Sequence, residues 1–104
     1  DFRHAYYKFY TFIRPERLPK GVSHETVIDA LQSVGVPCLS GSCSEIYLEK
    51  AFPNKWRPSE RLPVAHELGA TSLMLPVHPT LKNETVQEWA KKITSLPKMF
   101  RKVG

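Results

Sequence analysis

The sequence has too few cysteines for a disulfide-stabilised fold or a zinc site. Among its 104 residues only Cys38 and Cys43 are cysteines, five positions apart. A bond between them is conceivable, but it would stand alone, whereas small disulfide-rich domains use several pairs. The four histidines are scattered, so no second ligand pair accompanies the cysteines. Two reduced cysteines are typical of a cytoplasmic protein, and we expect no metal.

The sequence also lacks long hydrophobic runs. No apolar stretch approaches the roughly 20 residues that a membrane helix needs. No charged start followed by an apolar run indicates a secretory signal. The chain begins at Asp1 and enters a strand pattern almost at once, so we expect it to be part of a longer polypeptide. With 41% hydrophobic and 24% charged residues, residues 1–104 are expected to form a single globular domain.

Acidic residues are outnumbered by basic ones. The net charge is +5 and the pI is about 9.4, which raises the possibility of nucleic-acid binding. The lysines and arginines are spread along the chain, with a mild cluster at Lys98, Arg101 and Lys102. A solvated basic surface is the simpler interpretation. The sequence has no Lys/Arg-Gly-Phe/Tyr motif of the kind that RNA-recognition strands carry.

Aromatic residues concentrate near the N-terminus and predict a strand over 4–13. Five aromatic side chains and Ile13 stand in the eight positions 6–13, and both faces of the alternation are largely apolar. This pattern predicts a strand covered on both sides, by helices or by a partner domain.

A helix is predicted over 24–34. Ser23 can cap it and Glu25 suits its first turn. Gly35 fits the left-handed position after the last turn, and Pro37 prevents continuation. The apolar side chains share one face, namely Val27, Ile28, Leu31 and Val34.

Shorter elements follow. Ser42 and Glu45 have capping-box spacing, which predicts a helix over 43–51. Pro63 predicts the first turn of another helix. That helix would end at Gly69 and bury Val64, Ala65 and Leu68.

The C-terminal part is predicted to contain a strand over 72–75 and a helix from Asn83 to Pro97. Four side chains recur at helical spacing and are expected to face the core, namely Val86, Trp89, Ala90 and Ile93. An apolar tail follows, with Met99, Phe100 and Val103. The predicted fold class is therefore α+β, a small antiparallel or mixed sheet with two main helices on one face.

The loop 40–44 is the main candidate for a binding site. Small side chains let backbone amides approach a ligand, and a helix start at Ser42 would offer unpaired N–H groups to a phosphate or sugar hydroxyl. The alternative is local: Ser42 caps a helix and Gly41 permits a tight turn. Cys43 at a helix start would have a lowered pKa, but the sequence places no histidine beside it as a catalytic partner.

Three segments resemble one family: residues 35–52, residues 62–70 and residues 75–79. Across about 4–93 the chain resembles the small C-terminal domain of the DegT/DnrJ/StrS sugar aminotransferases, which have fold type I. The resemblance implies a parent enzyme that uses pyridoxal phosphate (PLP) to move an amino group, usually from glutamate, to a nucleotide-linked keto sugar. The products of such enzymes enter polysaccharide or antibiotic biosynthesis.

The resemblance places the chemistry outside these residues. The family's reactive lysine and its acid belong to a large N-terminal PLP-binding domain, so we assign no catalytic residue and no cofactor ligand here. The 104 residues alone are expected to be inactive. The implied partners are that domain in the same polypeptide, a nucleotide-sugar substrate with its amino donor, and a second subunit in a homodimer.

The resemblance also suggests substrate-binding candidates. In many family members the corresponding loop carries Gly-x-His-Tyr and faces the cleft. Here Gly41 and Ser42 occupy those positions and the histidine is missing, in a Gly-Ser-Cys-x-Glu-Ile-Tyr form that looks like a distinct subgroup. The candidates are Ser40, Gly41, Ser42, Cys43, Ser44, Tyr47 and His4.

Two other functions remain open from the residues. One is a stand-alone basic α+β module that binds RNA or another anionic partner. The other is a regulatory domain that binds a small anion at the loop 40–44.

Overall fold

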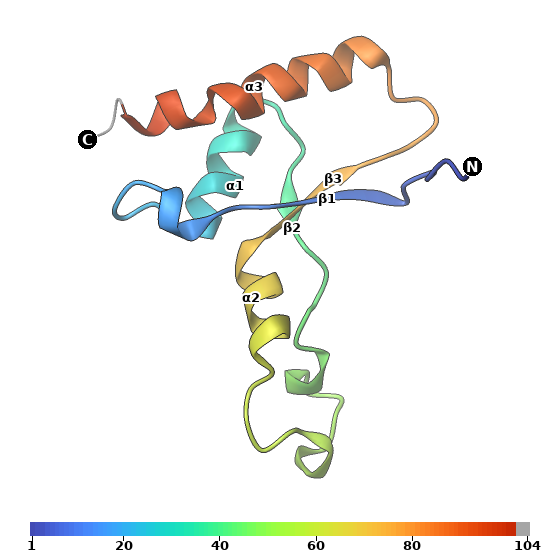
Figure 1. The fold of residues 1–104 in the computed structure, drawn as a ribbon, viewed down its shortest axis with the longest axis vertical. Helices are drawn as coiled ribbons and strands as arrows, with labels where there is room; N and C mark the ends of the chain where they lie inside the picture. The colour runs from blue at the N-terminus through green and yellow to red at the C-terminus, as the bar shows by residue number, and fades with distance from the viewer. Residues whose placement is uncertain (102–104) are drawn as a thin grey trace.

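A computed structural model of the protein describes residues 1–101 around a three-stranded antiparallel sheet with the strand order β1-β3-β2 (Figure 1). The strands and helices are β1 (Lys8–Phe12), α1 (His24–Ser33), β2 (Leu39–Ser40), α2 (Pro63–Thr71), β3 (Ser72–Pro76) and α3 (Asn83–Arg101). Single 3₁₀ turns lie at Pro15–Arg17, Ile46–Leu48 and Asn54–Trp56. The α+β prediction is confirmed. No helix in residues 1–101 is both long and apolar enough to cross a membrane.

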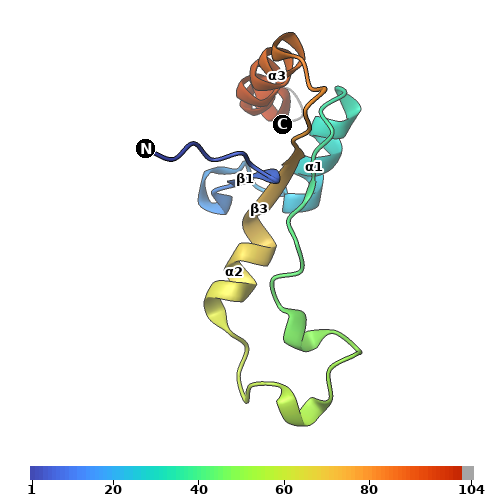
Figure 2. The ribbon, with the colours of Figure 1, turned by 90° about the vertical axis from the view of Figure 1, so that its right-hand side faces the viewer.

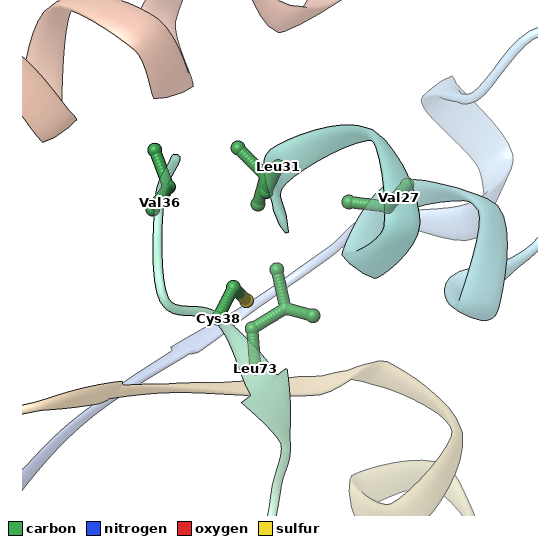
Figure 3. Close-up of a cluster of buried hydrophobic side chains, with 5 residues drawn as sticks. All are labelled: Val27, Leu31, Val36, Cys38 and Leu73. Carbon is green, nitrogen blue, oxygen red and sulfur yellow. The ribbon is translucent and has the colours of Figure 1, made fainter. Parts of the chain in front are cut away.

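Helices α1 and α3 pack on one face of the sheet. The buried core joins α1, the segment after it and β3 through five side chains (Figure 3), namely Val27, Leu31, Val36, Cys38 and Leu73. Partly buried side chains of α3 pack against this core, among them Trp89, Ile93, Leu96 and Phe100. The predicted helix face is thus correct for Trp89 and Ile93, but Val86 and Ala90 are exposed.

The local signals at α1 act as predicted. The Ser23 hydroxyl accepts a hydrogen bond from the Thr26 N–H at 3.2 Å, and the Thr26 hydroxyl accepts one from the Ser23 N–H at 3.3 Å. Both orphan donors are therefore satisfied in a reciprocal cap. Gly35 has φ +82°, the left-handed conformation that favours glycine after a helix.

Strand β1 differs from its prediction in length and in place. Tyr6 has φ 53°, which is incompatible with an extended strand through that residue, so pairing begins at Lys8. Because β1 pairs only with β3, it is an edge strand among the described residues. Its aromatic side chains stay open to solvent, including Phe9 at 44% and Phe12 at 54% exposure. Cover on both sides is therefore absent within residues 1–101.

The predicted helix over 43–51 is wrong: the structure has only the 3₁₀ turn Ile46–Leu48 there. Neither half of the expected capping box forms. The Ser42 hydroxyl is hydrogen-bonded to the Tyr10 hydroxyl, and the Glu45 carboxylate binds Arg61. The two side chains that a local capping box needs therefore form hydrogen bonds with residues that are distant in the sequence.

The ends of two helices also need correction. Helix α2 continues past Gly69 to Thr71, and Val64 and Leu68 are 66% and 42% exposed, not buried. Helix α3 continues through Pro97 to Arg101. Leu96 and Phe100 on either side of the proline pack against the core, which compensates for the backbone hydrogen bond that proline removes. Lys102 and Val103, named in the sequence analysis, lie outside the described residues.

Residues 41–62 form a long excursion, called the arm here, between β2 and α2. Figures 1 and 2 show the arm extending away from α1 and α3. The radius of gyration is 16.5 Å, whereas a compact domain of this length has about 13 Å. The arm therefore receives little support from the helical layer, and its base is where the candidate loop lies.

Candidate functional site

The loop 40–44 is fixed against the sheet at the base of the arm. The Gly41 N–H donates to the Ser72 carbonyl at 3.2 Å, which extends the β2–β3 pairing by one residue. The hydroxyls of Tyr10 and Ser42 lie 2.5 Å apart. A side chain on Gly41 would place its Cβ 1.9 Å from the Ser72 Oγ. The glycine is thus required for close packing on β3, independently of any ligand.

All five loop residues border one hollow. Its volume is about 390 Å³, and it lies between the loop 40–44, the rest of the arm and α2. Its lining residues are Ser40, Gly41, Ser42, Cys43, Ser44, Glu45, Leu48, Glu49, Arg61, His66, Gly69 and Ala70. The structure therefore brings the predicted loop together with charged residues from distant parts of the chain.

Glu45 joins the two ends of the arm. Its carboxylate accepts hydrogen bonds from Arg61 Nε at 2.6 Å, from the second Arg61 nitrogen at 2.7 Å and from the Tyr47 hydroxyl at 2.7 Å. His66 Nδ1 lies 3.3 Å from the same carboxylate. The Tyr47 hydroxyl in turn accepts from the Leu62 N–H at 3.0 Å. This two-point Arg61–Glu45 pairing is the stronger kind of charged hydrogen bond.

The same contacts change the acidity of Glu45. The hydrogen bond from Arg61, with smaller contributions from Tyr47 and His66, lowers the pKa of Glu45 from its usual 4.5 to about 2. The side chain is only 13% exposed. Glu45 therefore stays ionised and holds Arg61 at any pH near neutrality.

We expect the arm to lose this contact in acid. A group whose pKa is depressed on folding stabilises the fold above its unfolded pKa, and this contribution is lost as the pH falls through the folded pKa. Between pH 4.5 and about 2, the NMR signal of the Arg61 Nε–H should therefore move to its exposed position. In the Glu45→Gln variant the signal should show no such transition. A wild-type signal that moves near pH 6 would contradict the assignment.

The charges of the hollow do not favour phosphate. Glu45 pairs with the guanidinium of Arg61, and Glu49 adds a second carboxylate to the lining. No α-helix begins at Ser42, so the helix N-terminus that would attract an anion is absent there. Other hydrogen-bonding groups of the loop in this lining are the hydroxyls of Ser40, Ser42 and Ser44. The hollow therefore suits a hydroxyl-bearing group better than a phosphate.

Cys43 does not have the lowered pKa predicted for it. Its thiol donates to Glu49 Oε1 at 3.2 Å. This hydrogen bond, together with burial and the negative charge of Glu49, raises the pKa of Cys43. Cys38 is buried in the core, and burial raises its pKa as well. Both cysteines are free thiols, and neither has thiolate character at neutral pH.

The Glu49→Gln variant should react faster at Cys43. Without the carboxylate the pKa of Cys43 falls, and the thiolate is the nucleophile. We expect several-fold faster alkylation by iodoacetamide at neutral pH, measured by mass spectrometry of the Cys43 peptide. Buried Cys38 serves as an internal control and should stay unmodified in both proteins. An unchanged Cys43 rate would contradict the role of Glu49.

The remaining predicted residues lie outside the lining of this hollow. Tyr47 belongs to the Glu45 network, and burial followed by its bond to Glu45 raises the pKa of Tyr47. His4 lies in the exposed N-terminal segment, where its Nδ1 accepts from the Tyr6 N–H at 2.8 Å. Arg61, His66 and Glu49 were missed by sequence reasoning. Their separations from the loop carry no periodic signal, so only the fold identifies them.

Two features of the described residues bear on a bound metal or cofactor, namely the clustering of metal-ligating side chains and the surroundings of Lys8. Among residues 1–101 no group of three or more His, Cys, Asp or Glu side chains is placed to hold a metal ion. A PLP enzyme needs a lysine for the cofactor and an acid for its ring nitrogen. Lys8 borders a hollow of about 580 Å³ whose lining contains no acidic residue.

Comparison with known proteins gives one informative match. No protein-family model matches the chain, and no curated protein does. A solved structure, the X-ray structure of the aminotransferase from Psychrobacter cryohalolentis, is 46% identical with a TM-score of 0.86. The match covers 95% of this chain and 25% of that chain.

The chain is similar to part of an aminotransferase. It spans about a quarter of the length of the solved structure it matches. Because the identity is 46% over nearly all of the chain, the match extends beyond a shared fold. The match agrees with the expectation that the chain is a small α+β portion of an aminotransferase. The resemblance to the DegT/DnrJ/StrS family remains a prediction.

Proposed function

We propose that this chain is the small C-terminal domain of a PLP-dependent sugar aminotransferase of the DegT/DnrJ/StrS family. The observation that carries the proposal is the 46% identity to an aminotransferase over 95% of the chain. The lysine, the acid and the cofactor then belong to a large domain of the same polypeptide.

The proposed role of the domain is to form one side of the substrate cleft. The loop 40–44 presents serine hydroxyls at a hollow of about 390 Å³. Sugar hydroxyls match this lining, since they both donate and accept hydrogen bonds. The diphosphate of a nucleotide sugar would then be bound elsewhere, because Glu45 and Glu49 oppose an anion here. The proposed enzyme is a cytoplasmic homodimer that takes its amino group from glutamate.

The test uses the intact gene product. Purified with PLP, it should show the visible absorbance of lysine-bound cofactor, and glutamate should bleach that absorbance. Nucleotide-linked keto sugars should then be aminated, as measured by mass spectrometry. The 104-residue chain is the control and should show neither signal. An intact product that neither binds PLP nor transfers an amino group would refute the proposal.

One observation favours the RNA-binding alternative. The aromatic side chains of β1 are exposed on an edge strand beside Lys8, and bases stack on exposed aromatic rings. Salt-dependent retardation of single-stranded RNA in a gel, lost in a Tyr10→Ser and Phe12→Ser variant, would support this function. An absence of retardation at low salt would exclude it.

A further inference from the structure

The sheet has an uncovered apolar face. The register places Tyr10, Met74 and Leu39 in one row across the three strands, and Phe12 stands two residues along β1 on the same side. Tyr10 is 41% exposed, while Phe12 and Leu39 are each 54% exposed. These four side chains are called the open face below.

Helices α1 and α3 do not cover this face. Their apolar residues pack with Leu73 and Leu75, which alternate with Met74 and so point to the opposite side. Two hollows border the open face. One of about 580 Å³ lies at the β2 edge, between Leu39 and Met74 and the segment 35–38, and the other, of about 210 Å³, is lined by Tyr10 and Phe12. Contiguous exposed apolar surface of this kind marks an interaction site.

The size of the core also indicates missing cover. Within residues 1–101 the buried core has only five hydrophobic side chains. The solved aminotransferase that matches this chain carries three quarters of its length outside the match. In that protein the equivalent of this sheet is joined to a much larger body of polypeptide.

We propose that the open face is the surface on which the rest of the aminotransferase polypeptide packs, through an apolar counter-surface. This inference rests on the proposed function. The smaller hollow beside Tyr10 and Phe12 is also lined by Ser42, Cys43 and Ser44. The loop 40–44 therefore lies at the seam between the two parts, with one side fixed to this sheet and the other facing the large domain.

Hydroxyl-radical footprinting of the intact gene product tests the inference without any substitution. Tyr10, Phe12, Leu39 and Met74 should be labelled several-fold more slowly than their exposure in this structure implies. Val64 on α2, 66% exposed, is the reference and should be labelled at the rate of an open side chain. Labelling should not depend on protein concentration, because the cover belongs to the same polypeptide.

A matched pair of variants gives a second readout. In the intact product, Leu39→Ser should lower the melting temperature by several degrees, whereas Val64→Ser should leave it unchanged. Labelling of the open face at the open rate in an active aminotransferase would overturn the inference and leave the proposed function standing. Protection in a product without PLP binding or transamination would instead refute the proposed function. A gene product of only these residues, protected by dimerisation, would overturn the inference.

Discussion

The Leu31→Ala variant of the 104-residue chain is expected to lose its cooperative unfolding transition. Leu31 is 2% exposed and is the largest fully buried side chain of the five-residue core. Truncating a buried leucine to alanine costs about 2–5 kcal/mol. Small domains have total stabilities of about 5–15 kcal/mol, and a core of this size indicates the low end. Urea denaturation followed by circular dichroism measures the effect.

Leu68→Ala is the matched control for this prediction. Leu68 is also a helical leucine, but it is 42% exposed. Its truncation in the same chain should change the free energy of unfolding by no more than about 0.5 kcal/mol, as surface substitutions usually do. If the two variants unfolded at the same urea concentration, the core would not be centred on Leu31.

Helix α1 shows what this sequence predicts well. Its cap, its apolar face and its glycine stop all act over fewer than five residues, and each is decided by the helix itself. Local propensity and the final fold therefore agree over His24–Ser33.

The arm shows where the same reasoning fails. Ser42 and Glu45 have the correct spacing for a local cap, but Tyr10 and Arg61 offer hydrogen bonds from 32 and 16 residues away. No periodicity in the sequence connects these groups. The Glu45 network, and with it most of the charged lining of the candidate hollow, therefore becomes visible only when the chain is folded.

Strand β1 is a third case, in which the sequence pattern predicts more burial than the described residues provide. Its two apolar faces predict cover on both sides. Helices lie on one side of the sheet but leave Phe9 on that side 44% exposed, and Tyr10 and Phe12 on the other side are open as well. The mismatch is explained if the second cover comes from the rest of an aminotransferase polypeptide, as the further inference proposes.

The Gly41→Ala variant is expected to disrupt the base of the arm. The new Cβ would lie 1.9 Å from the Ser72 Oγ and 2.7 Å from the Ser72 Cβ. The hydroxyl can rotate away, but the Cβ is fixed to the backbone of β3, so the strands must separate. Overpacking of this kind costs about 1–3 kcal/mol. Urea unfolding should show the loss, and the Gly41 amide should exchange faster with solvent.

Two further variants separate this steric effect from a general effect of removing glycine. At Gly69 the added Cβ would meet only the tip of Ser44, 2.4 Å from its Oγ and 3.7 Å from its Cβ. That hydroxyl can turn aside, and alanine is favoured over glycine inside a helix by about 0.5–1 kcal/mol. Gly69→Ala should therefore be neutral or stabilising.

Adding Ser72→Gly to Gly41→Ala removes the atoms that clash, so the double variant should be more stable than the sum of the single changes predicts. Strict additivity would show that the cost of Gly41→Ala arises elsewhere than at β3.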